Sequence, residues 1–466
     1  MNFPAFSSGA ARRAWTAAAM AALPLLLAAC GGGGSDAAPP GSGGTTLSAA
    51  AQLGRKIFAD KALSASGQQS CSSCHVAASA FAEDATASGV DHGSPVALGG
   101  LAMNKTGFRN TPSLMYAALT PIFYINADGG PHGGFFRDGR AATLADQAVL
   151  PFTTSFEMAN PDAAAVVTLL KTRPYLADFT ALYGSAVLDD PATALARMGQ
   201  ALAAFETEDP GFAPFSSKYD YFLKGQATLT AQEQRGLGLF NGATKGNCGA
   251  CHPSTSADGR TPPMFTDYSY DNLGVPRNGL IPANGSSAPG YTPVDSTDGV
   301  QAYYDLGVCG PFREQTLNFF SNCGQFKVPT LRNIAATAPY FHNGRFTTLV
   351  DAIGFYVRRD TNPEEWYPAN PDGSVTKFDD LPAIYGGQFV VTPGLVGSDA
   401  GYLGNVNTSE IPYNRHIGDT PALSSTEIDD VIAFLCTLTD GYDPANPTAQ
   451  VLPAQCQAAA SAAAAP

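Results

Sequence analysis

The stretch Cys71-Ser72-Ser73-Cys74-His75 places two thiols three residues apart, with a histidine directly after them. Thiols at this spacing can add to the two vinyl groups of a haem, and the histidine that follows can bind the iron. The pattern recurs at Cys248-Gly249-Ala250-Cys251-His252. The two copies predict two covalently bound c-type haems. The alternative is a pair of zinc knuckles, but no further Cys and His pairs lie at zinc-finger spacing.

The sequence before each motif is also repeated. A helical segment, Leu53–Phe58, leads to the first motif, and Leu229–Phe240 precedes the second. Gly236 and Phe240 match Gly54 and Phe58, which indicates two homologous units. We therefore expect a mainly α fold with two cytochrome c-like haem domains and long ordered loops.

Several other segments carry helix signals. Ala163–Thr172 and Pro191–Phe205 have helical patterning, and Thr230 and Glu233 form a predicted capping box. A second predicted box, Ser424 with Glu427, precedes apolar residues at helical spacing: Ile428, Val431, Ile432 and Leu435. Residues 253–325 are rich in Pro, Gly and Asn and predict an ordered loop over the second haem, which a Cys309–Cys323 disulfide would clip. The predicted division is 1–30 signal, 31–46 tether, 47–225 first haem domain, 226–440 second haem domain and 441–466 tail.

The N-terminal segment predicts export. Arg12 and Arg13 precede an apolar run, Ala17–Ala29, that is too short to span a membrane permanently. It ends in Leu27-Ala28-Ala29-Cys30, which resembles a bacterial lipobox and implies cleavage before Cys30 and lipidation of its thiol. The alternative is an ordinary signal peptide that contains a cysteine. Either way we expect a location at the periplasmic face of the bacterial cell envelope, tethered to the membrane by a lipid anchor only, or soluble in the periplasm.

Composition narrows the partners and the cysteine chemistry. A formal net charge of −14 disfavours nucleic acid, whose phosphates would be repelled. After the haem and lipobox cysteines are set aside, the remaining four allow two plausible disulfides, Cys309–Cys323 and Cys436–Cys456. Free thiols are the alternative.

The iron ligands are constrained by few residues. His75 and His252 are the expected proximal ligands. The other histidines are His92, His132, His342 and His416. No methionine follows Met264, so the C-terminal part cannot supply a Met ligand, and a Met ligand from residues 103–264 is the alternative, without a supporting motif.

The chain resembles the bacterial diheme cytochrome c peroxidase and MauG family over about residues 47–440. Beside both CxxCH motifs, the resemblance rests on four stretches: Arg109–Leu114, Asp138–Gln147, Glu157-Met158 and Lys327–Gly344. It implies that the N-terminal haem binds peroxide, with Glu157 moving a proton during O–O cleavage and Gln147 orienting the peroxide.

The resemblance also implies ligands at the second haem and a metal ion. Tyr356 occupies the position that carries methionine in conventional peroxidases, and a phenolate would lower the haem potential. The alternative is a tyrosine that packs in the core. A calcium ion bound by Asn110 and the carbonyls of Thr337 and Pro339 is implied as well, although Asn110 could instead cap a turn.

Two departures from the family pattern matter. Arg137 stands where the family usually has the tryptophan that lies between the haems, so electrons would have to pass between the haems by another route. The histidine that blocks the resting N-terminal haem in many members has no match in register. His92 lies one position away, in a stretch that resembles a turn.

We expect a peroxidase that reduces hydrogen peroxide with electrons from a small cytochrome or cupredoxin, as a monomer or homodimer. One alternative is a MauG-like enzyme that oxidises a side chain of a partner protein. Another is an electron-transfer cytochrome without turnover, which predicts two six-coordinate haems and an inert Glu157.

Overall fold

The computed structural model describes residues 46–83, 96–281, 284, 304–310, 312–313, 320–399 and 402–457. The predicted signal segment, Cys30, most of the tether and His92 lie outside these residues, so what was predicted for them stays a prediction. No helix in the described part of the chain is long and apolar enough to cross a membrane.

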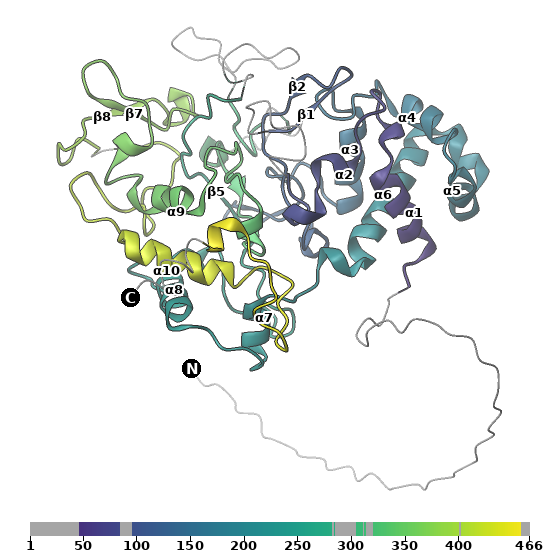
Figure 1. Ribbon diagram of the computed structural model, residues 1–466. Helices are drawn as coiled ribbons and strands as arrows, with labels where there is room; N and C mark the ends of the chain where they lie inside the picture. The colour runs from purple at the N-terminus through teal and green to yellow at the C-terminus, as the bar shows by residue number, and fades with distance from the viewer. Residues whose placement is uncertain are drawn as a thin grey trace, which may run out of the picture. The chain divides into compact units, whose positions relative to one another are not determined.

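The described residues are mainly helical, as predicted (Figure 1). The α-helices are α1 (Ala49–Ala59), α2 (Cys71–Cys74), α3 (Leu144–Thr153), α4 (Ala163–Leu170), α5 (Leu176–Tyr183), α6 (Pro191–Glu208), α7 (Lys218–Leu223), α8 (Ala231–Asn241), α9 (Leu349–Arg358) and α10 (Ser425–Cys436). The strands form short antiparallel ribbons: β1 (Leu98–Gly99) with β2 (Lys105–Thr106), β3 (Tyr124–Ile125) with β4 (Pro131–His132), β5 (Tyr270–Asp271) with β6 (Phe326–Lys327), and β7 (Val375–Lys377) with β8 (Phe389–Val391). The predicted helices at 53–58, 163–172, 191–205 and 229–240 are confirmed within a few residues as α1, α4, α6 and α8.

Helices α1 and α6 pack directly against each other. At their contact is Gly54, where a Cβ atom would lie 1.9 Å from the carbonyl oxygen of Ala201. Only glycine permits this approach of the two backbones. One turn further on, the ring of Phe58 meets that of Phe205 edge to face, with centroids 5.5 Å apart.

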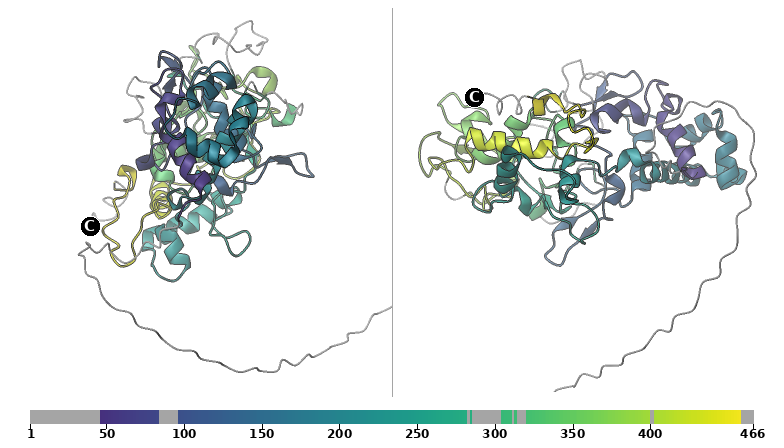
Figure 2. Two further views of the ribbon diagram at one scale, coloured as in Figure 1. Left: turned by 90° about the vertical axis from the view of Figure 1, so that its right-hand side faces the viewer. Right: turned by 60° about the horizontal axis from the view of Figure 1, so that its bottom comes forward.

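Helices α8 and α10 repeat this arrangement in the second half of the chain (Figures 1 and 2). A Cβ on Gly236 would lie 1.9 Å from the carbonyl oxygen of Asp430. The rings of Phe240 and Phe434 are 5.2 Å apart and again edge to face. The echo of Gly and Phe in the sequence therefore marks the same helix contact made twice.

Both predicted capping boxes are present. Thr230 and Glu233 exchange side-chain to backbone hydrogen bonds at the start of α8, and Ser424 and Glu427 do so at the start of α10. The apolar residues predicted to share one face of α10 are all buried: Ile428, Val431, Ile432 and Leu435.

The described residues form two large hydrophobic cores, beside a small cluster of Phe135, Ala141 and Leu144. The first is made of buried side chains between Leu53 and Phe212, and the second of side chains between Tyr219 and Cys456. The first core therefore ends and the second begins between Phe212 and Tyr219. We propose the domain boundary shortly after this point, at about residue 225.

Polar contacts join the two halves. Arg109 forms a two-pronged ion pair with Asp305, at 2.5 and 2.6 Å. The hydroxyl of Tyr270 donates to the carbonyl oxygen of Gly133 at 2.7 Å. These contacts place the loops of the first half against those of the second.

Both predicted disulfides are confirmed, Cys309–Cys323 and Cys436–Cys456. The first closes a loop inside the 253–325 region, whose described residues contain the strand β5 and little other regular structure. The second ties the end of α10 to the C-terminal segment.

Candidate functional site

The first CxxCH motif lies on the single-turn helix α2. Ser70 precedes it and forms a capping box with Ser73. Nδ1 of His75 lies 2.9 Å from the carbonyl oxygen of Phe81. The ring therefore donates its Nδ1–H to that oxygen, which leaves Nε2 with a free lone pair. Burial lowers the pKa of His75 to about 4, so the imidazole is neutral and able to bind a metal.

The second motif repeats this geometry. Nδ1 of His252 lies 2.8 Å from the carbonyl oxygen of Phe265, and burial lowers the pKa of this histidine too. Phe81 and Phe265 both have a φ of 52°, in the left-handed region. No local pattern marked these two carbonyl acceptors in the sequence, because they lie 6 and 13 residues after their histidines.

Both motifs line one continuous cavity. Their cysteines are all unpaired thiols, available for thioether bonds: Cys71, Cys74, Cys248 and Cys251. Apolar side chains such as Phe58 and Leu202 complete the walls, which suits a large flat macrocycle. Among the described residues, no three His, Cys, Asp or Glu side chains converge as zinc ligands would. The site fits haem and does not support the zinc-knuckle alternative.

The two residues predicted to act on peroxide face the same cavity as His75. Gln147 is on α3, one turn after the cap residue Thr143, and Glu157 follows the end of that helix. Burial raises the pKa of Glu157, and the nearby positive charge of Arg140 opposes the shift. A carboxyl group with a raised pKa gives up and takes back a proton more readily near neutral pH.

Tyr356 lies on α9 and also lines the cavity, near Cys251. Its hydroxyl has no hydrogen-bond partner within the described ranges. Burial and nearby negative groups, Asp271 among them, raise the pKa of Tyr356, and the charge of Arg359 opposes this shift. A second buried tyrosine, Tyr413, which sequence reasoning missed, stands beside it with ring centroids 5.9 Å apart.

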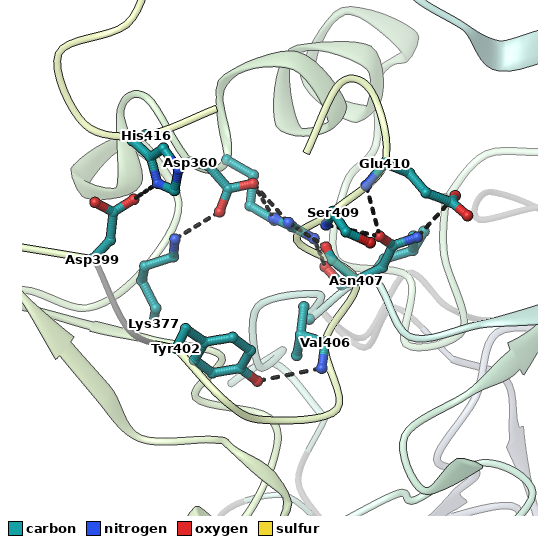
Figure 3. Close-up of polar contacts among 12 residues, drawn as sticks. Asp360, Lys377, Asp399, Tyr402, Val406, Asn407, Ser409, Glu410 and His416 are labelled. Carbon is teal, nitrogen blue, oxygen red and sulfur yellow. Dashed lines mark hydrogen bonds and ion pairs between the residues drawn. The ribbon is translucent and has the colours of Figure 1, made fainter. Parts of the chain in front are cut away.

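A buried ionic network holds Arg359 in place beside these tyrosines. Arg359 binds Asp360 at 2.6 Å, and Lys377 binds the other oxygen of the same carboxylate at 2.6 Å. Figure 3 shows Lys377 pointing at Asp360, with the His416–Asp399 pair nearby. The guanidinium carbon of Arg359 is 4.3 Å from the centroid of the Tyr413 ring. A fixed positive charge therefore stands close to both phenols.

The residues predicted to bind calcium meet a different cation. Asn110 donates from Nδ2 to the carbonyl oxygen of Pro339, and its Oδ1 accepts a hydrogen bond from Nη2 of Arg137. Burial lowers the pKa of Arg137 to about 9, so the guanidinium stays charged at neutral pH. The amide oxygen that calcium would need is already bound, and we conclude that this donor set does not fit a calcium ion.

The remaining described histidines make other contacts. His342 is buried and stacks on the ring of Phe326 with centroids 3.8 Å apart, and its backbone oxygen accepts from the N–H of Asn110. His132 stacks on Tyr124, an exposed residue of the β3–β4 ribbon.

One further acidic residue at the cavity was missed. Glu206, on α6, is only 5% exposed, and its Oε2 has no hydrogen-bond partner in the described structure. Burial raises its pKa to about 8. Its counterpart in the second helix pair is the apolar Leu435, since Glu206 follows Phe205 as Leu435 follows Phe434. Because α6 also has a polar face, a glutamate in its sequence is expected to be exposed, and nothing in the sequence signals that Glu206 is buried.

The proteins to which this chain is similar include di-haem peroxidases. The family model for di-haem cytochrome c peroxidase matches residues 48–228. The chain is 35% identical over 398 residues to the methylamine utilization protein MauG of Paracoccus denitrificans, covering 85% of this chain and 90% of that protein. It is 28% identical over 317 residues to the cytochrome c551 peroxidase of Nitrosomonas europaea, covering 67% and 74%. The crystal structure of the diheme peroxidase BthA from Burkholderia thailandensis superimposes with a TM-score of 0.72, at 35% identity over 85% of this chain and 87% of that one.

Two CxxCH motifs with neutral, oriented histidines in one apolar cavity define a c-type cytochrome that carries two haems. Given the extent of the MauG match, the chain belongs to the bacterial di-haem cytochrome c peroxidase and MauG family, whose members include peroxidases.

Proposed function

We propose that the protein reduces hydrogen peroxide to water with two electrons from a small donor protein and two protons. The observation that carries this proposal is the presence of Glu157 and Gln147 in the same cavity as Cys71, Cys74 and His75. When bound, the first haem supplies an iron centre that can coordinate peroxide and change its oxidation state.

The side chains would handle protons and orientation. Glu157 takes a proton from one peroxide oxygen and returns it to the oxygen that leaves as water, a transfer that its raised pKa favours. Gln147 can donate from its amide and hold the peroxide in place. Burial keeps His75 neutral, and its Nδ1–H donates to the Phe81 carbonyl, so its Nε2 would be the atom that holds the iron.

The second haem would pass on electrons. His252 and Tyr356 are the residues that would hold its iron. Burial and the nearby charge of Asp271 raise the pKa of Tyr356 and Arg359 only opposes this shift, so bonding to the iron would have to stabilise the phenolate. A phenolate ligand stabilises the more oxidised states of the iron.

Oxidation of a side chain on a partner protein is the second candidate function. It is favoured by the 35% identity to MauG and by a tyrosine, not a methionine, at position 356. The two functions differ in what is consumed: the peroxidase oxidises a donor that is recycled, whereas the alternative leaves a covalent change on its partner.

The location is also a proposal. The lipobox-like sequence at Cys30 supports export and a lipid anchor at the periplasmic face of the cell envelope. Globomycin-sensitive processing, or mass spectrometry of the mature N-terminus, would test it.

Turnover of the holoprotein tests the peroxidase proposal. With a reduced small cytochrome as donor, we expect Glu157→Gln to lower the rate of peroxide consumption by about 100-fold or more. Glu364→Gln, at an exposed acid outside the cavity, is the control and should keep the wild-type rate. Unchanged turnover in Glu157→Gln, or two low-spin haems that ignore peroxide even after partial reduction, would refute the proposal.

A further inference from the structure

Arg137 stands at the boundary between the two halves of the chain and binds both. Its backbone oxygen accepts from the N–H of Lys327 at 2.8 Å, so the main chain of the first half is tied to strand β6 of the second. Its side chain lines the cavity and reaches Asn110.

The guanidinium of Arg137 binds both oxygens of Asn110, the side-chain Oδ1 and the backbone oxygen. Nη2 donates to the side-chain Oδ1, and Nε and Nη2 each lie 3.4 Å from the backbone oxygen. Asn110 in turn donates to the Pro339 oxygen through Nδ2 and to the His342 oxygen through its backbone N–H. Asn110, in the first half, is thus linked to a loop of the second half, and the guanidinium cation of Arg137 is bound to the oxygens of Asn110.

The charges nearby oppose a second cation. Arg109 and Arg140 also lie here and share the carboxylate of Asp138, and Arg109 binds Asp305 as well. Arg313 donates to the backbone oxygen of Asp138, so with Arg137 four guanidinium groups of the described residues lie near the carboxylates of Asp138 and Asp305. A divalent ion placed on Asn110 would meet a net positive charge at short range, in a buried setting where screening by solvent is weak.

We propose that Arg137 is a built-in replacement for the calcium ion at the junction of the halves. The guanidinium supplies the positive charge to the oxygens of Asn110, and its covalent attachment makes the junction independent of metal. The metal content of the protein is measured without turnover, so a failure of this proposal is distinguishable from a failure of the peroxidase proposal.

The test is the metal content of the purified holoprotein and of Arg137→Gln. We expect no stoichiometric calcium in the wild type by mass spectrometry of the metal, and no change in its haem optical and EPR spectra with EGTA. Removing the guanidinium frees Asn110 Oδ1, beside the Pro339 carbonyl oxygen that Asn110 already contacts. Arg137→Gln should therefore bind about one calcium ion per chain, measured by titration calorimetry, with a rise in Tm.

Arg313→Gln is the matched control. Arg313 belongs to the same cationic region and donates to the Asp138 backbone oxygen, but it has no bond to Asn110. This variant should take up no calcium. Stoichiometric calcium in the wild type that EGTA removes with a change in the haem spectra would overturn the proposal, and so would a folded Arg137→Gln protein without saturable calcium binding. If Arg137→Gln does not fold, the wild-type metal content and its EGTA response still decide.

Discussion

Gly236 lies against the backbone of Asp430 so closely that a Cβ on the glycine would be 1.9 Å from the Asp430 carbonyl oxygen. The pair formed by Gly54 and Ala201 repeats this relationship in the first half. Each haem motif is therefore preceded by a helix that crosses a later helix at van der Waals contact between backbones.

Gly236→Ala should destabilise the protein, because the added methyl group meets backbone and not a movable side chain. We expect a loss of about 2 kcal/mol or more in the free energy of unfolding, measured by denaturant titration. Gly238→Ala is the control on the same helix, since no atom lies within 4 Å of a Cβ there. It should be neutral or gain up to about 1 kcal/mol from helix propensity. Equal effects of the two substitutions would contradict the proposed contact.

Glu206 should make stability depend on pH. Its folded-state pKa of about 8 lies above the ordinary value of 4.5, so the folded protein holds the proton more tightly than the unfolded chain does. The resulting stabilisation is fully present below about pH 4.5 and is lost as pH rises through about 8, at roughly 1.4 kcal/mol per pH unit between these values.

Glu206→Gln removes this titration. We expect the unfolding free energy of the variant to fall less between pH 5 and pH 8 than that of the wild type, roughly by the slope given above. Glu364→Gln, at an exposed acid, should keep the wild-type pH dependence. Parallel pH profiles for wild type and Glu206→Gln would show that the buried carboxyl is not the titrating group.

Tyr356→Phe should alter the ligand field of the second haem alone. Low-temperature EPR of the ferric protein is expected to lose or shift one low-spin signal, because phenylalanine has no oxygen to bind iron. Tyr413→Phe is the matched control and should leave the ligand assignment unchanged, although its ring lies 5.9 Å from that of Tyr356. A signal that changes in the Tyr413 variant and not in the Tyr356 variant would transfer the assignment to Tyr413.

Removal of the Cys436–Cys456 disulfide should lower the free energy of unfolding, because the unfolded chain gains conformational freedom. A bond that closes a separation of 20 residues is expected to contribute about 3 kcal/mol by loop-closure entropy. The double variant with both cysteines changed to alanine leaves no stray thiol and should unfold at lower denaturant concentration. An unchanged midpoint in the oxidised protein would show that this loop is already restricted without the bond.

Features that repeat along the chain were predictable from the sequence. The CxxCH motifs, the Gly and Phe echo and the two capping boxes depend on neighbours within one helical turn or on an internal copy, and both disulfides followed from the remaining cysteines. Contacts between distant residues were not predictable. The link from Arg137 to Asn110 joins residues 27 apart, and the approach of Tyr413 to Tyr356 depends on how a long loop returns to α9. Nothing in either local pattern specifies that return.

Each hydrophobic core is drawn from a continuous run of chain, the first ending at Phe212 and the second beginning at Tyr219. The predicted export signal is at the N-terminus, so the first half would cross the membrane before the second, and domains generally fold as units. The α1–α6 contact, and the core behind Cys71, can thus form while the second motif is still crossing. The order of export would then separate the maturation of the two centres in time, and each half would present a single CxxCH segment to the haem attachment machinery.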